Sequence, residues 1–146
     1  MKVEATYSTP VETNNPMEPS ATVAHWEGER LTVEDATQAV VGTRDTLAAV
    51  FGIPRDSVRV LCPFTGGGFG CKGFQWPHTL LAAMAAKIVA RPVQLNLSRA
   101  QMFTSCGHRA STIQRMTLAA QKDGTLTAMR HDTLQPTSPP VLQRGR

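Results

Sequence analysis

Apolar and polar residues alternate over residues 3–8, and this period of two predicts a β-strand near the start of the chain. The same alternation over residues 21–26 and 30–33, on either side of a Glu-Gly-Glu turn, predicts a β-hairpin. A polar stretch with two prolines, residues 12–19, separates the first strand from the hairpin and is expected to form a loop.

The period changes to that of a helix over residues 39–51, where apolar side chains fall mainly on one helical face. The sequence Gly52-Ile53-Pro54 ends this pattern. An apolar, β-branched stretch over residues 57–61 predicts a short buried strand, and a cluster of glycines follows it. A second, alanine-rich helix is expected over residues 80–90, with Pro77 suited to its first turn.

Three further strands are predicted over residues 92–97, 112–119 and 126–131, the last two as a hairpin around an Asp-Gly turn. A short helical turn is expected over residues 100–104. Strands with two main helices in this order predict an α+β (mixed α/β) fold. Residues 134–146 contain a proline-rich run that cannot continue a strand, so we expect a disordered tail there.

Composition excludes several classes of protein. The chain has 146 residues, which is sufficient for one domain with a core, and its 41% of hydrophobic residues is typical of globular proteins. The formal net charge is +4, but lysine and arginine are scattered, so no nucleic-acid partner is expected. No apolar run approaches the roughly 20 residues that span a bilayer, and from the first residues we expect no export signal.

The glycine cluster, residues 66–72, is the strongest local signal. Glycine permits positive φ angles and brings main-chain N–H groups close to a ligand. At the start of a helix such donors suit an anion or an electron-rich oxygen. The cluster matches neither the P-loop nor the GxGxxG dinucleotide motif. Taken alone, it is explained equally well by a glycine-rich crossover that binds nothing.

The sequence Gly-Gly-Gly-Phe-Gly-Cys-Lys of this cluster closely resembles the GGGFGxK loop of the large subunits of xanthine dehydrogenases and aldehyde oxidases. Other blocks similar to that family follow in the same order: Thr9-Pro10, Asn15-Pro16-Met17-Glu18-Pro19, Thr37-Gln38, Gly52-Ile53-Pro54, Val58-Arg59-Val60, Arg91-Pro92-Val93, Gly107-His108-Arg109 and Asp123-Gly124. The resemblance covers residues 5–133 and is greater to the bacterial aldehyde-oxidising branch than to the purine branch.

The resemblance implies that residues 1–133 form part of a larger molybdopterin-binding domain. It implies a molybdenum–pterin cofactor in the cytosine dinucleotide form, with iron–sulfur clusters and FAD on partner subunits, and an aldehyde or N-heterocycle as substrate. Purine-oxidising relatives carry a glutamate at the position of Gly73, so xanthine is not the expected substrate. The compartment, cytoplasmic or periplasmic, stays open.

By resemblance, Gly67, Gly68, Phe69 and Gly70 are candidates for contact with the cofactor, with the Phe69 N–H facing a metal-bound oxygen. A Phe69 ring packed in the core is the alternative or additional role. Many relatives carry glutamine at the position of Glu12, whose carboxylate cannot donate a hydrogen bond unless it is protonated. Glu12 is therefore either a cofactor-contacting residue or a surface-loop residue.

Three basic residues, Lys72, His108 and Arg109, are expected to have structural roles. Lys72 is expected to stabilise the loop by its charge rather than to act as a base, because a lysine base must be desolvated. His108 and Arg109 are expected to brace a turn, with a cofactor contact as the alternative.

No catalytic residue and no metal ligand is assigned in this chain. The general-base glutamate of the family lies far toward the C-terminus of complete subunits, beyond the part that the resemblance covers. Three hypotheses follow: part of a molybdenum hydroxylase, a catalytically inactive remnant, or a stand-alone module that binds a cofactor or a protein.

Overall fold

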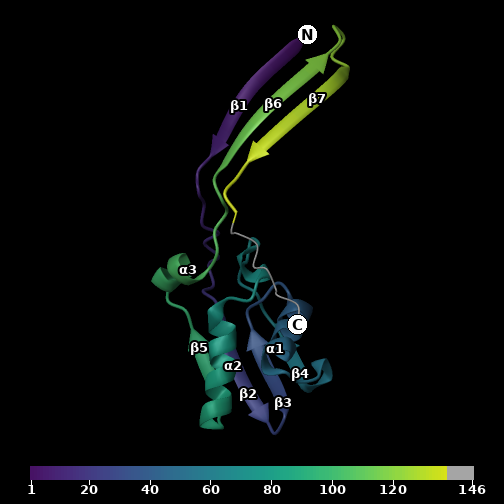
Figure 1. Ribbon diagram of the computed structural model, residues 1–146. Coiled ribbons are helices and arrows are strands. Elements are labelled where there is room, and N and C mark those ends of the chain that lie inside the picture. Colours follow the sequence, from purple (N-terminus) through teal and green to yellow (C-terminus); the bar gives the residue numbers. More distant parts are fainter. Residues whose placement is uncertain (138–146) are drawn as a thin grey trace. The chain divides into compact units, whose positions relative to one another are not determined.

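The structure is a computed structural model that describes residues 1–137 and comprises two compact units. Met1–Glu12 and His108–Arg146 form the first unit, and Thr13–Gly107 forms the second. Both are drawn in Figure 1. A tail was predicted over residues 134–146. Leu134 instead ends a strand, and residues 138–146 lie outside the described residues.

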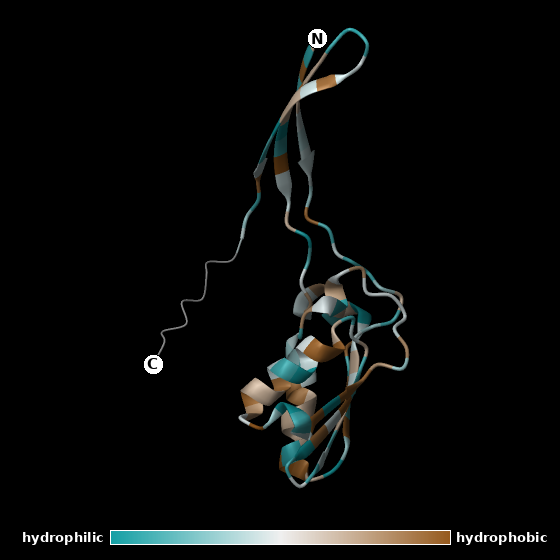
Figure 2. Ribbon diagram, turned by 90° about the vertical axis from the view of Figure 1, so that its right-hand side faces the viewer, coloured by the Kyte–Doolittle hydropathy of each residue, from teal (hydrophilic) through white to brown (hydrophobic). Residues whose placement is uncertain are grey.

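The first unit is an antiparallel sheet of three strands in the order β1 (Lys2–Thr9), β6 (Thr112–Ala120) and β7 (Leu126–Leu134). These strands confirm the predicted ones, with ends that differ by up to three residues. Val3, Leu118 and Met129 lie opposite one another in register, so they share one face of the sheet. Figure 2 shows apolar and polar bands alternating along these strands.

The second unit contains a sheet of four strands in the order β4 (Val58–Leu61), β3 (Arg30–Asp35), β2 (Ala21–Glu27) and β5 (Val93–Asn96). The predicted hairpin is β2–β3, which is antiparallel, whereas β3 and β4 are parallel. Three α-helices complete the unit: α1 (Val40–Phe51), α2 (Pro77–Val89) and the short α3 (Arg99–Ser105). Two 3-10 turns are present, η1 (Arg55–Ser57) and η2 (Cys71–Gly73). The α+β class with two main helices is thereby confirmed.

Small side chains let the helices approach the sheet closely. Helix α1 ends at Gly52, whose φ of 65° is in the left-handed region that glycine adopts readily. Helix α2 has Pro77 at its first position, as predicted. The core combines aliphatic residues of the sheet and α1 with alanines of α2: Ala24, Leu31, Val33, Leu47, Ala48, Val58, Val60, Ala82, Ala83 and Ala86.

Candidate functional site

The glycine loop, residues 66–72, lies in the second unit between β4 and α2. Gly67, Phe69 and Gly70 have φ angles of 93°, 51° and 92°, so the main chain turns repeatedly through the left-handed region. The loop ends in η2, and α2 begins only at Pro77. The main-chain donors therefore belong to the loop itself and not to the first turn of α2.

At two of the glycines, an added Cβ atom would collide with another side chain of the chain. A Cβ atom on Gly66 would lie 2.6 Å from Cβ of Glu18. On Gly68, it would collide with the side chain of Gln38. Any larger residue at these two positions would displace the neighbouring side chain or the loop. Part of the glycine pattern is thus explained without a ligand.

Glu18 fastens the first half of the loop. Its N–H donates to the carbonyl of Gly66 at 3.1 Å, and the N–H of Gly66 donates to its carboxylate at 2.9 Å. The same carboxylate oxygen pairs with the ammonium of Lys72, whose side chain is 1% exposed. Burial would raise the pKa of Glu18, but Lys72 and the Gly66 N–H outweigh it and hold the pKa below its usual value. Lys72 therefore stabilises the loop, as the sequence predicted.

Gln38 stabilises the second half of the loop through hydrogen bonds. The N–H of Gly70 donates to the side-chain oxygen of Gln38 at 3.1 Å. The N–H of Gln38 donates to the carbonyl of Lys72 at 2.9 Å, and the hydroxyl of Thr37 donates to the same carbonyl at 3.1 Å. Sequence reasoning noted the Thr37-Gln38 pair as a family block but did not predict these contacts.

Two adjacent main-chain donors of the loop stay available. The N–H groups of Gly66 and Gly70 are bonded to side chains, whereas those of Gly67 and Gly68 donate to no acceptor within residues 1–137. Phe69 is 60% exposed, so the idea that it packs into the core is wrong. The contacts of Gly67, Gly68, Phe69 and Gly70 with a cofactor stay predictions.

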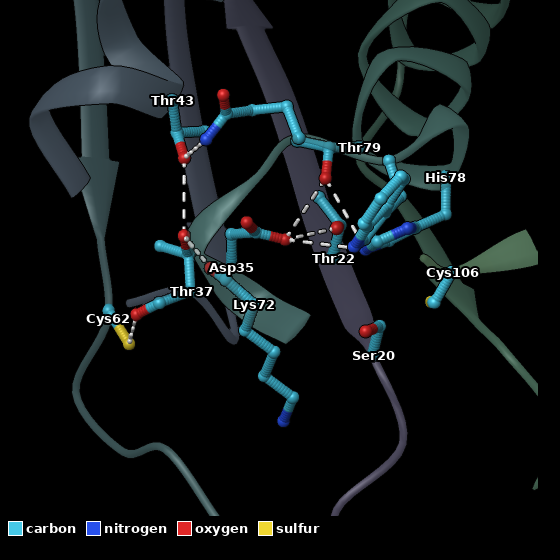
Figure 3. Close-up of polar contacts among 12 residues, drawn as sticks. Ser20, Thr22, Asp35, Thr37, Thr43, Cys62, Lys72, His78, Thr79 and Cys106 are labelled. Atoms are coloured by element: carbon cyan, nitrogen blue, oxygen red, sulfur yellow. Dashed lines mark hydrogen bonds and ion pairs between the residues drawn. The ribbon is translucent and has the colours of Figure 1, made fainter. Parts of the chain in front are cut away.

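A buried polar network lies next to the loop (Figure 3). The carboxylate of Asp35 accepts from the hydroxyls of Thr22 at 2.5 Å and Thr79 at 3.4 Å, and Nε2 of His78 lies 3.9 Å away. Burial raises the pKa of Asp35 and lowers the pKa of His78, in both cases against the charged form. This network links β2, β3 and α2. The sequence pattern did not predict it.

A second branch of the network reaches the loop itself. The amide of Gln75 donates to the hydroxyl of Thr43 at 2.8 Å, and that hydroxyl lies 3.3 Å from the hydroxyl of Thr37. Since Thr37 also bonds the carbonyl of Lys72, α1 is connected to the end of the glycine loop by side-chain hydrogen bonds. The end of the loop therefore has polar contacts at Lys72, next to the apolar cluster in which Cys71 packs with Leu97 and Met102.

Glu12 belongs to the first unit, unlike the loop. It forms an isolated β-bridge with Arg109, in which each N–H donates to the other's carbonyl, at 3.2 and 2.8 Å. The expected role of Arg109 in a turn stays a prediction. A contact of Glu12 with a cofactor stays a prediction.

Within residues 1–137, no group of three or more His, Cys, Asp or Glu side chains is arranged to hold a metal ion. No helix in this part of the chain is long and apolar enough to cross a membrane.

Residues 1–140 match the family described as the molybdopterin cofactor-binding domain. The chain belongs to this family. Among curated relatives, this molybdopterin cofactor-binding domain is 38% identical over 133 residues to the aldehyde oxidoreductase molybdenum-binding subunit PaoC of Escherichia coli K12, which covers 91% of the chain and 18% of PaoC. It is 31% identical to the putative xanthine dehydrogenase molybdenum-binding subunit XdhA of the same organism. That match covers 93% of the chain and 18% of XdhA.

Solved structures agree with the fold. Quinoline 2-oxidoreductase from Pseudomonas putida 86 superposes with a TM-score of 0.82 at 29% identity, and 91% of the domain and 17% of that chain are covered. Aldehyde oxidoreductase from Desulfovibrio gigas gives a TM-score of 0.82 at 27% identity. The match covers 92% of the domain and 15% of that chain. The domain thus spans less than a fifth of the length of these relatives and corresponds to one segment of a molybdenum-binding subunit.

The glycine loop suits such a cofactor. Gly67 and Gly68 supply two neighbouring N–H donors that no side chain of their own covers, and fixed main-chain donors match oxygen-rich groups. Their fixed geometry comes from contacts at Gly66 and Gly70. Nothing in this arrangement requires a protein side chain as a metal ligand.

Proposed function

We propose that this chain binds the molybdenum–pterin cofactor, in its cytosine dinucleotide form, as part of a molybdenum hydroxylase subunit. Gly67, Gly68, Phe69 and Gly70 are the proposed contacts, with Glu12 as a further candidate. The observation that supports the proposal best is the pair of available N–H donors at Gly67 and Gly68. Their neighbours Gly66 and Gly70 are held by hydrogen bonds to side chains. Main-chain donors suit this task because they do not titrate.

When bound, the cofactor supplies the two-electron oxidation of a substrate carbon. The residues of this chain donate hydrogen bonds to it and orient it. An aldehyde or an N-heterocycle is the proposed substrate class, since the similar proteins are named for aldehyde and quinoline oxidation. An iron–sulfur subunit and an FAD subunit are the proposed partners. We assign the catalytic base to no residue of this chain.

A chimera tests the proposal. Residues 1–133 replace the matching segment of PaoC, and molybdenum and released pterin are measured per purified subunit. We expect the chimera to carry cofactor. Gly68→Ala should abolish cofactor binding by the chimera, because the new Cβ would collide with Gln38. Gly73→Ala should leave cofactor binding unchanged, because no atom lies within 4 Å of its new Cβ.

A chimera that assembles without cofactor would contradict the proposal, and so would equal occupancy in the two alanine variants. The chain alone is expected to carry almost no molybdenum, because it spans 18% of the length of PaoC. Stoichiometric cofactor on the chain alone would favour the stand-alone binding module instead.

A further inference from the structure

Gln38 contacts the glycine loop in three ways, although it lies outside the loop and immediately before α1. Its side-chain oxygen accepts from the N–H of Gly70 at 3.1 Å. Its own N–H donates to the carbonyl of Lys72 at 2.9 Å. Its side chain also occupies the space that a Cβ on Gly68 would fill. One exposed residue therefore contacts Gly68 and the part of the loop that follows it.

A run of glycines does not order itself. Glycine loses more conformational freedom on folding than any other residue, so a loop with four glycines among five residues needs contacts from outside to hold one conformation. Glu18 provides these contacts at Gly66, and Gln38 provides them at Gly70. The available donors of Gly67 and Gly68 lie between these two points.

The contacts that Glu18 and Gln38 make with the loop differ in how deeply they are buried. Glu18 is joined to the buried ammonium of Lys72, so its removal disturbs the fold as well as the loop. The Gln38 side chain is exposed and belongs to no core cluster. Its removal should therefore disturb the loop and leave the rest of the unit intact.

We propose that Gln38 is a positioning residue, which holds the N–H groups of Gly67 and Gly68 in the orientation that receives the cofactor. This role rests on the proposed function. Gln38 itself does not contact the cofactor in the proposal, because its side-chain oxygen is already bonded to the N–H of Gly70.

The test compares three variants of the full chain. Gln38→Met keeps the length of the side chain but loses the acceptor, Gln38→Glu keeps the acceptor, and Val41→Met places the same new side chain on an exposed position of α1. Nitrogen-15 relaxation reports the order of Gly67, Gly68 and Gly70. We expect order parameters of these amides to fall from about 0.85 to below about 0.6 in Gln38→Met only. Urea unfolding should show similar stability for all variants.

The chimera with PaoC then connects loop order with binding. Gln38→Met should lower pterin occupancy at limiting cofactor by on the order of five-fold, the equivalent of one hydrogen bond, and Val41→Met should not. Unchanged relaxation in Gln38→Met would overturn the proposal, and so would a disordered loop with unchanged occupancy. A wild-type chimera without cofactor would overturn the proposed function and with it the cofactor-positioning role. The relaxation data would still decide whether Gln38 holds the loop.

Discussion

At the scale of single residues, the ion pair between Glu18 and Lys72 is asymmetric. The side chain of Lys72 is 1% exposed, whereas that of Glu18 is 35% exposed. Glu18→Gln leaves a buried ammonium without its counter-charge, and we expect a loss of on the order of 3–5 kcal/mol in the free energy of unfolding. Lys72→Met leaves a carboxylate that water can reach, and we expect a loss of about 1 kcal/mol. Urea unfolding of the two variants measures both values.

The order of the two losses is the decisive result. If Lys72→Met destabilises the chain as much as Glu18→Gln, then the ammonium is not the buried partner. Glu4→Gln is a suitable control, because its pair with Lys2 is exposed on both sides and should contribute little.

Residue patterns in the sequence could predict the glycine loop but not what holds it. The loop is contiguous, so its unusual composition is visible directly. Glu18 and Gln38 are separated from their loop partners by 48 and 32 positions. No local pattern reports a contact over that distance. The same reason explains why the network around Asp35 was missed: its members come from β2, β3 and α2.

At the scale of elements, local patterns predicted every strand and both long helices, because alternation, helical period and short apolar runs are each visible within one segment. The partners of the strands could not be predicted in the same way. β1 pairs with β6 over more than a hundred positions, and β3 and β4 are parallel because α1 connects them. The turn η2 was also missed, since three residues show no period.

The short helix α3 depends on its N-terminal cap. The hydroxyl of Ser98 accepts from the N–H of Gln101 at 3.2 Å, and the side chain of Gln101 accepts from the N–H of Ser98 at 2.8 Å. In the same helix, Arg99 donates to the carbonyls of Pro16 and Met17. Fraying of α3 should therefore also release the loop that precedes Glu18.

We expect Ser98→Ala to lower the free energy of unfolding by about 1 kcal/mol and to increase amide exchange in α3 and at Glu18, whose N–H donates to the carbonyl of Gly66. Hydrogen exchange followed by mass spectrometry measures both effects. The control is Ser105→Ala at the other end of α3, where the hydroxyl makes no hydrogen bond with the described residues. Increased exchange in α3 without an effect at Glu18 would show that Arg99 does not couple the two segments.

At the scale of the whole molecule, the two units differ in how they bury apolar surface. The second unit encloses a core between helices and a sheet, whereas residues 1–12 and 108–137 form one sheet without a helix. The register places Val3, Tyr7 and Met129 on one face of that sheet, and they are 50%, 57% and 69% exposed. An apolar face of this kind should bind a hydrophobic dye and promote association of the chain in solution.

Two neighbouring positions of β7 test this expectation, because adjacent residues of a strand point to opposite faces. Met129→Lys places a charge on the apolar face, and Ala128→Lys places the same charge on the face that carries Glu4, Arg115 and Arg130. We expect Met129→Lys to lower dye fluorescence and to reduce association in sedimentation velocity, and Ala128→Lys to change neither. Equal effects of the two variants would mean that net charge, rather than the apolar face, controls association. A selective effect of Met129→Lys would show that the apolar face of this sheet promotes association of the chain.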